Sequence, residues 1–218
     1  MFNPSRKEKI LNKIRGFFQP YLVGIHRFFL KDKSFTIISN NCWGGICYEY
    51  FGLAKNSPTV GCFFFANDYL KFIKSLKVYL SKPLEFISLN ESSHKEWLLK
   101  KNISCPIGKL DDVEIFFLHY KDNFTAKEKW ERRVKRINWD NLVFKFSQMN
   151  ECLPSHLEDF EKSSLPGKKF MFVSNPNHKF SCGVYYPGYE DDEEIDNDTF
   201  YWNRYIDVIK FLNYGKKE

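Results

Sequence analysis

The stretch SFTIIS, residues 34–39, runs directly into NNCWGG, residues 40–45, and this succession decides the fold. The four central residues of SFTIIS, Phe35 to Ile38, are apolar or β-branched with little alternation, which is typical of a strand buried on both faces of a parallel sheet. The two glycines lead into an apolar segment at 46–53 that we expect to be helical and to end at Gly52. A strand, a loop and a helix in this order predict an α/β domain.

The rest of the chain continues the alternation. Further strands are predicted at 59–65, 84–89, 104–110, 113–119, 142–146 and 169–173, and helices at 67–76, 124–137, 154–163 and 205–213. We therefore expect residues 34–218 to form a single three-layer α/β domain with a mostly parallel central sheet. Residues 190–198 hold seven acids and no base, a pattern typical of a solvated loop.

The composition is that of a folded globular protein, with 43% hydrophobic and 28% charged residues among 218. It excludes a disordered tail and a collagen-like chain. None of the six cysteines forms a Cys-x-x-Cys pair, so we expect free thiols in a reducing cytoplasm and no metal cofactor. The longest stretch with an apolar tendency, residues 16–30, is too short and too polar to span a bilayer.

The net charge of +6 belongs to the N-terminal segment. Residues 1–33 hold eight Lys or Arg and two acids, whereas residues 34–218 hold 25 residues of each sign. A protein that binds nucleic acid usually spreads its basic surface over the folded body, so we expect no nucleic-acid partner. Residues 1–33 are expected to form a separate basic appendage.

The appendage has the pattern of a basic amphipathic helix. Asn3 and Pro4 are typical of a helix start, apolar residues recur on one face from Ile10 to Phe18, and Pro20 is expected to end or kink the helix. Residues 4–18 are thus expected to bind an anionic membrane surface, at the inner face of the cytoplasmic membrane. The alternative is that the apolar face docks on the domain.

The loop after the first strand is the first candidate site, because ligands of open α/β sheets bind at the carboxyl ends of strands. Gly44 and Gly45 permit close approach to the backbone, and the helix start offers free N–H groups. A thiol at such a position tends to have a lowered pKa, which makes Cys42 a candidate nucleophile. Asn40 and Asn41 are candidate oxyanion or substrate contacts. The alternative is a tight turn with a buried cysteine.

His119 is the second candidate. It ends the strand predicted at 113–119, and it would emerge beside Cys42 if that strand lay next to the first one. A Cys–His pair suits acyl transfer, with the imidazole as general base. A histidine at a strand end is otherwise structural or merely exposed.

A cationic face on the helix predicted at 124–137 is the third candidate. Lys129, Arg133 and Arg136 recur at i, i+4 and i+7 without an acid at that spacing. Arginine forks make paired contacts to phosphate or carboxylate, so this face is expected to hold an anionic group of the substrate. The alternative is a solvated basic face that complements the helix dipole.

These motifs together resemble a bacterial exopolysaccharide-biosynthesis family known as domain of unknown function 1919. The resemblance covers about residues 35–213. It is carried by residues 38–45, 52–53, 56–59, 106–120, 129–138 and 208–213. It implies a place in capsule, exopolysaccharide or lipopolysaccharide biosynthesis, and it implies no particular reaction.

The leading hypothesis is a transferase that modifies a bacterial capsular, exo- or lipopolysaccharide or its precursor. Acyl (acetyl) transfer from acetyl-CoA to a saccharide or lipid-linked saccharide is favoured, with Cys42 as nucleophile and His119 as base. One alternative is a glycosyl- or phosphosugar-transferase that uses the cationic helix and no thiol. Another is a non-catalytic assembly protein docked at the membrane.

Overall fold

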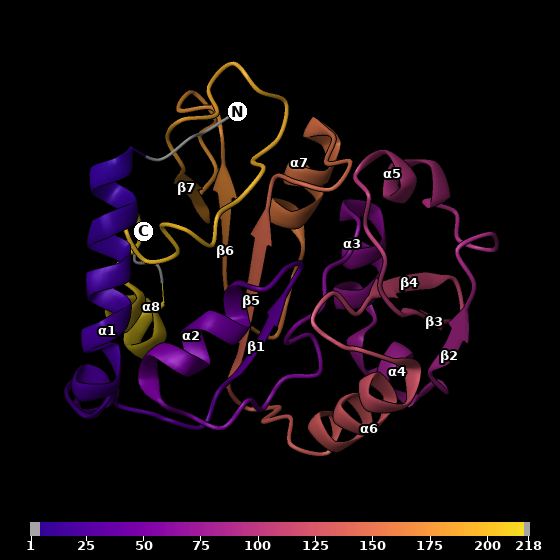
Figure 1. The fold of residues 1–218 in the computed structure, drawn as a ribbon, viewed down its shortest axis with the longest axis horizontal. Coiled ribbons are helices and arrows are strands. Elements are labelled where there is room, and N and C mark those ends of the chain that lie inside the picture. The colour runs from indigo at the N-terminus through magenta and orange to yellow at the C-terminus, as the bar shows by residue number, and fades with distance from the viewer. Residues whose placement is uncertain (1–4, 216–218) are drawn as a thin grey trace.

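The computed structural model describes residues 5–215 and shows a mixed α/β fold with two sheets (Figure 1). The strands are β1 (Thr36–Ser39), β2 (Glu85–Ile87), β3 (Ile107–Leu110), β4 (Val113–Phe116), β5 (Leu142–Ser147), β6 (Gly167–Val173) and β7 (Gly183–Tyr185). The helices are α1 (Arg6–Phe28), α2 (Trp43–Phe51), α3 (Ala66–Lys74), α4 (Leu76–Ser81), α5 (Lys95–Lys100), α6 (Asn123–Val134), α7 (Pro154–Lys162) and α8 (Val208–Tyr214).

The larger sheet is parallel, with the strand order β1-β5-β6-β7. Strands β1 and β5 are buried at every residue, as their apolar sequences predict. The expected α/β fold with a mostly parallel sheet is therefore confirmed, while the three-layer arrangement stays a prediction. Because the strands run the same way, the residues that end them, Ser39, Ser147 and Val173, lie at one edge of the sheet.

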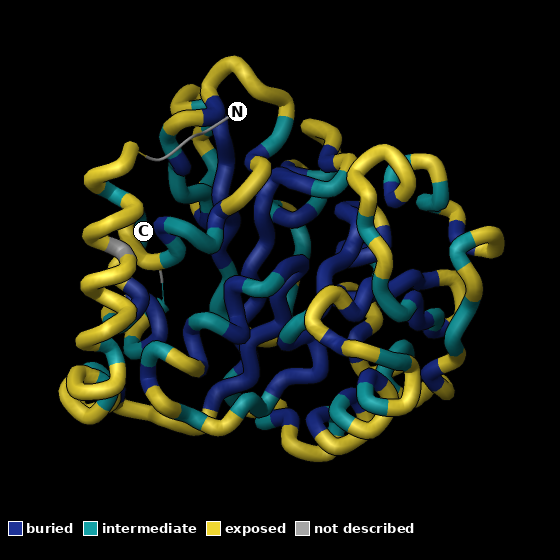
Figure 2. Tube along the Cα trace, viewed as in Figure 1, coloured by how far each residue is buried: buried dark blue, intermediate teal, exposed yellow. Residues whose placement is uncertain are grey.

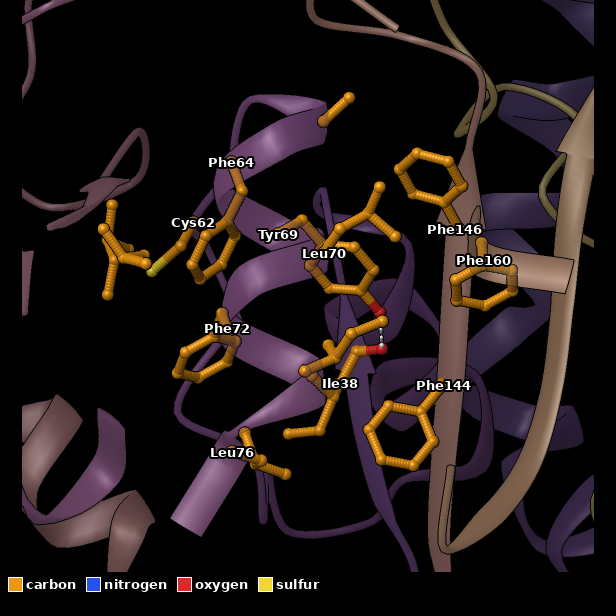
Figure 3. Packing of buried hydrophobic residues seen from close by; sticks show 14 of the residues in the cluster. Ile38, Cys62, Phe64, Tyr69, Leu70, Phe72, Leu76, Phe144, Phe146 and Phe160 are labelled. Atoms are coloured by element: carbon orange, nitrogen blue, oxygen red, sulfur yellow. Dashed lines mark hydrogen bonds between the residues drawn. The ribbon is translucent and has the colours of Figure 1, made fainter. Parts of the chain in front are cut away.

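Apolar side chains alternate between the two faces of this sheet. Ile38 and Phe144 belong to a core shared with α3 and α7, whereas Ile37 belongs to a second core shared with α2 and α8. Figure 3 shows the first core, in which Tyr69 of α3 reaches the sheet. Its hydroxyl lies 2.8 Å from the Ile38 carbonyl oxygen and 2.9 Å from the Lys145 carbonyl oxygen, so it ties α3 to both β1 and β5.

The second sheet is an addition that the expected single sheet did not include. Strands β2, β3 and β4 are antiparallel, and β3 and β4, which lie within the strands predicted at 104–110 and 113–119, form a hairpin. The prediction of a strand at 59–65 is wrong, because among residues 5–215 this segment pairs only through an isolated bridge between Phe63 and Phe116. Phe63 and Phe64 are buried in different clusters, so the segment joins the two sheets instead of extending either.

The N-terminal helix is longer than predicted. Ser5 and Glu8 form a capping box at the start of α1, while Asn3 and Pro4 lie outside the described residues. Pro20, expected to end or kink the helix, lies inside it and does not end it, because the missing N–H removes only one of its many hydrogen bonds. The helix packs along α2 and is exposed over most of its length (Figure 2).

None of the helices within residues 5–215 is both long enough and apolar enough to cross a membrane.

Candidate functional site

The loop that follows β1 is built into the sheet edge by its asparagines. The Asn40 amide donates to the Ser147 carbonyl oxygen and accepts from the Ser147 N–H, both at 3.0 Å, which joins the ends of β1 and β5. The Asn41 side-chain oxygen accepts from Lys145 Nζ at 2.9 Å and from the Trp43 N–H at 3.1 Å. Both predicted substrate contacts therefore already bind groups within the protein.

A buried ion pair lies beneath this loop. Lys145 of β5 and Asp198 are both fully buried, and the ammonium donates to the carboxylate. The same carboxylate accepts from the Ser147 hydroxyl and, at 2.8 Å, from the Asn41 amide. Burial lowers the pKa of Lys145, because it disfavours the charged form, and the nearby Asp198 opposes that shift.

The interpretation of residues 190–198 as a solvated loop is therefore wrong at its C-terminal end. Ile195 and Asp198 are buried, and the Ile195 N–H donates a 2.7 Å hydrogen bond to the Gln148 carbonyl oxygen. Asp198 can be buried in the core because its carboxylate forms an ion pair with the buried Lys145 ammonium. The sequence contained a signal, since a lysine inside the apolar strand Leu-Val-Phe-Lys-Phe-Ser requires a buried acid.

Asp196-Asn197-Asp198 in this segment is also an Asp-x-Asp sequence. The second aspartate of this sequence, Asp198, forms its ion pair with the Lys145 ammonium. Within the described part of the chain, His, Cys, Asp and Glu side chains do not gather in groups of three or more that could hold a metal ion.

Two cavities open at this edge of the sheet and share Cys42, His119 and Thr199. The first, the acidic cavity, has a volume of about 350 Å³. Its lining includes the aromatic side chains of Phe63 and Trp97 and the carboxylates of Glu194, Asp196 and Asp198. It also includes Lys101, whose ammonium lies 3.9 Å from the Asp196 carboxylate. The second, the cationic cavity, has a volume of about 470 Å³, and its lining includes Gly45, Lys55, Tyr120, Lys129 and Arg133.

Cys42 lies where the two cavities meet, at the N-cap of α2, and it is partly buried. Burial raises the pKa of its thiol to about 11, and the negative charge of Asp198 adds to that rise while Lys145 opposes it. The position of Cys42 at the start of α2 therefore does not give its thiol the lowered pKa that the sequence suggested. About one thiol in ten thousand is ionised at pH 7 with such a pKa.

His119 reaches the same two cavities, although β4 does not pair with β1 as the prediction required. The residue follows β4 in the second sheet, and its N–H donates a 3.2 Å hydrogen bond to the Gly61 carbonyl oxygen. Gly61 has a left-handed φ of 80°, and a Cβ there would lie 2.9 Å from the Tyr120 ring. The segment that joins the sheets thus brings His119 to the cavities. Among the hydrogen bonds between described residues, none links His119 to Cys42.

The two glycines of the loop set how closely α2 lies on its neighbours. A Cβ on Gly44 would lie 3.0 Å from the Ile37 side chain, and one on Gly45 would lie 3.1 Å from the Val60 side chain. Gly44 therefore lets α2 pack on β1, whereas Gly45 lines the cationic cavity. Of the two, Gly45 is the one whose backbone a ligand can approach.

The predicted cationic face divides into three different environments. Arg133 is only 7% exposed, and its guanidinium donates to the Val60 carbonyl oxygen at 3.0 Å and to the Tyr120 hydroxyl. The Lys129 ammonium lies 5.8 Å from the centre of the Tyr120 ring. Arg136 lies beyond the end of α6, is exposed, and does not line either cavity.

Arg133 has no acidic partner among residues 5–215, and neither has Lys129. The carboxylate in the lining of the cationic cavity, Glu49, is 2.6 Å from Lys55. A buried guanidinium stays charged and is costly without a counter-ion, so the cavity is suited to an anion.

Comparisons with known proteins place the chain among uncharacterised relatives. The family described as Domain of unknown function (DUF1919) matches residues 14–214. A protein of Haemophilus influenzae described as "Uncharacterized protein" is 30% identical over 226 residues, which covers 98% of this chain and 100% of the relative.

The buried ion pair can be tested by removing one charge. Asp198→Asn leaves Lys145 without its counter-ion, and we expect the free energy of unfolding in urea to fall by about 3 kcal/mol or more. Asp196→Asn, two residues away and half exposed, is the control and should change it by less than about 0.5 kcal/mol. Stability equal to that of the wild type in Asp198→Asn would show that the pair does not hold the segment.

The raised pKa of Cys42 predicts slow alkylation at neutral pH. The rate constant for iodoacetamide at Cys42, followed by peptide mass spectrometry of the folded protein, should rise about tenfold per pH unit between pH 7 and pH 10. Cys105, whose pKa burial also raises to about 11, is the matched comparison. A rate that levels off near pH 7 would contradict the burial of the thiol.

Proposed function

The chain belongs to the DUF1919 family, and we propose that it is a transferase acting on a phosphate-bearing saccharide. The observation that carries this proposal is the pair of adjoining cavities, one cationic and one aromatic and acidic, at the carboxyl edge of a parallel sheet. The exopolysaccharide association of the sequence resemblance points to a precursor of a bacterial surface polysaccharide. The six free thiols suit a reducing cytoplasm, where such precursors are activated.

The cationic cavity would bind the phosphate. A phosphate oxygen next to Arg133 would provide a counter-charge that no acidic side chain among residues 5–215 supplies, and the flexible Lys129 at the cavity wall would reach a second oxygen. The Tyr120 hydroxyl and the Val60 carbonyl hold the guanidinium in place before the ligand arrives. The site would therefore be organised in advance, which lowers the cost of binding.

The acidic cavity would bind the sugar. Carboxylates and amides accept hydrogen bonds from hydroxyl groups, and Glu194, Asp196 and Asn197 line this cavity. The rings of Trp97 and Phe63 offer apolar surface for the faces of a sugar ring.

His119 lies at the junction and is the group best placed to move a proton. In transfer of the sugar, an acceptor hydroxyl attacks the anomeric carbon, the bond from that carbon to the phosphate oxygen breaks, and the phosphate leaves with the electron pair. The imidazole would take the proton of the acceptor, and Arg133 and Lys129 would stabilise the charge on the leaving phosphate.

Acyl (acetyl) transfer is the second candidate, and the shared position of Cys42 and His119 on both cavities favours it. The phosphates of acetyl-CoA would suit the cationic cavity. The raised pKa of Cys42 weighs against it, because the thiolate is the nucleophile.

Titration calorimetry with UDP-glucose and UDP as probes tests the first candidate. Lys129→Ala should weaken the binding of both about tenfold, since a hydrogen bond to a charged group contributes about 1.5 kcal/mol. Lys127→Ala, which removes an exposed cation of the same helix outside the cavities, should leave binding unchanged. If neither probe binds, the proposal fails and the non-catalytic assembly protein becomes the better hypothesis.

Incubation with radiolabelled acetyl-CoA separates the two candidates. Acyl transfer through the thiol predicts label on Cys42, lost in Cys42→Ala and kept in the control Cys105→Ala. Transfer of a phosphate-bearing sugar predicts no label on either protein, and that is the result we expect.

A further inference from the structure

Helix α1 turns a largely polar side toward the domain. Gln19, Val23 and His26 are half-buried and recur at i, i+4 and i+7. The Gln19 amide donates a 2.7 Å hydrogen bond to the Tyr50 carbonyl oxygen, and the His26 ring stacks on the Tyr50 ring with 4.0 Å between their centres. Val23 is the apolar member of the three, and it packs against Gly52. The helix is therefore held to the domain largely by polar side chains.

The opposite side of α1 carries a continuous set of exposed apolar side chains, which we call the outer stripe. Its members are Ile10, Ile14, Phe17, Tyr21, Ile25 and Phe28, and their exposed fractions run from 48% to 80%. Their spacing of three or four residues puts them on one helical face, about half a turn from Gln19 and His26. An exposed apolar patch of this extent marks an interaction surface.

Basic side chains flank the outer stripe. Arg6, Lys7, Lys13 and Arg27 are all exposed, and residues 1–33 carry the whole net charge of +6. Two copies of the chain packed through this face would bring like charges together, which opposes self-association. An anionic lipid surface instead suits both features of the helix, because it accepts the apolar side chains and neutralises the cations.

We propose that the outer stripe of α1 docks the protein on an anionic membrane surface. The helix would lie in the plane of the interface, with Phe17, Tyr21 and Phe28 inserted and the domain above it. The docking surface extends over 10–28, whereas the sequence suggested residues 4–18. This inference does not rest on the proposed function, since the cavities play no part in it.

Vesicle flotation of the full chain tests the docking surface. The wild type should float with vesicles of phosphatidylcholine and phosphatidylglycerol and much less with phosphatidylcholine alone. Phe17→Glu with Phe28→Glu should lower the partition coefficient at least about a hundredfold. Lys13→Gln should lower it about fivefold.

Val78→Glu with Leu99→Glu is the matched control. These side chains are 57% and 56% exposed and lie far along the chain from α1, so vesicle binding should not change. All variants are surface changes, and their circular dichroism and melting temperature should match those of the wild type. Wild-type protein that stays unbound, or equal binding by Phe17→Glu with Phe28→Glu, would overturn the proposal. A dimer in light scattering that this double variant dissociates, without vesicle binding, would assign the surface to a second copy.

Discussion

Asp198 brings one negative charge to the edge of the parallel sheet, where Lys145, Ser147 and Asn41 all donate to its carboxylate. Neither member of the ion pair is exposed, so each charge is tolerated only because the other is present. The two residues come from segments 53 positions apart. The pair therefore fixes residues 190–198, the acidic segment, against the end of β5. Much of the candidate site depends on that placement.

Both cavities acquire part of their lining from this anchored segment. Glu194, Asp196 and Asp198 line the acidic cavity, and Thr199 lines both. On the other side, Arg133 holds the segment that joins the two sheets through its bond to Val60. That segment also carries Gly61, to whose carbonyl His119 is bound. Two buried cations thus position the lining of the site, and of the two only Lys145 has an acidic partner among residues 5–215, which is why we propose Arg133 as the group that meets a ligand anion.

Helix α1 and the cavities present different kinds of surface. The cavities lie where side chains from the β1, β4 and β5 ends converge, and they combine charge with burial. The outer stripe is apolar, exposed and surrounded by cations, and it lies on an element that the domain contacts through Gln19, Val23 and His26. The transfer that we propose and the membrane docking that we propose would therefore use separate surfaces of the protein.

The sequence by itself determined the features that depend on near neighbours in the chain. The apolar runs at β1 and β5, the strands at 104–110 and 113–119 and the helix at 124–137 were all predictable, because strand burial and helical periodicity are local. The tertiary structure alone decided the burial of Asp198, the arrival of His119 at the cavities and the outward direction of the outer stripe. Each depends on a partner distant in sequence, and a charged or apolar residue shows its environment only when that partner is in place.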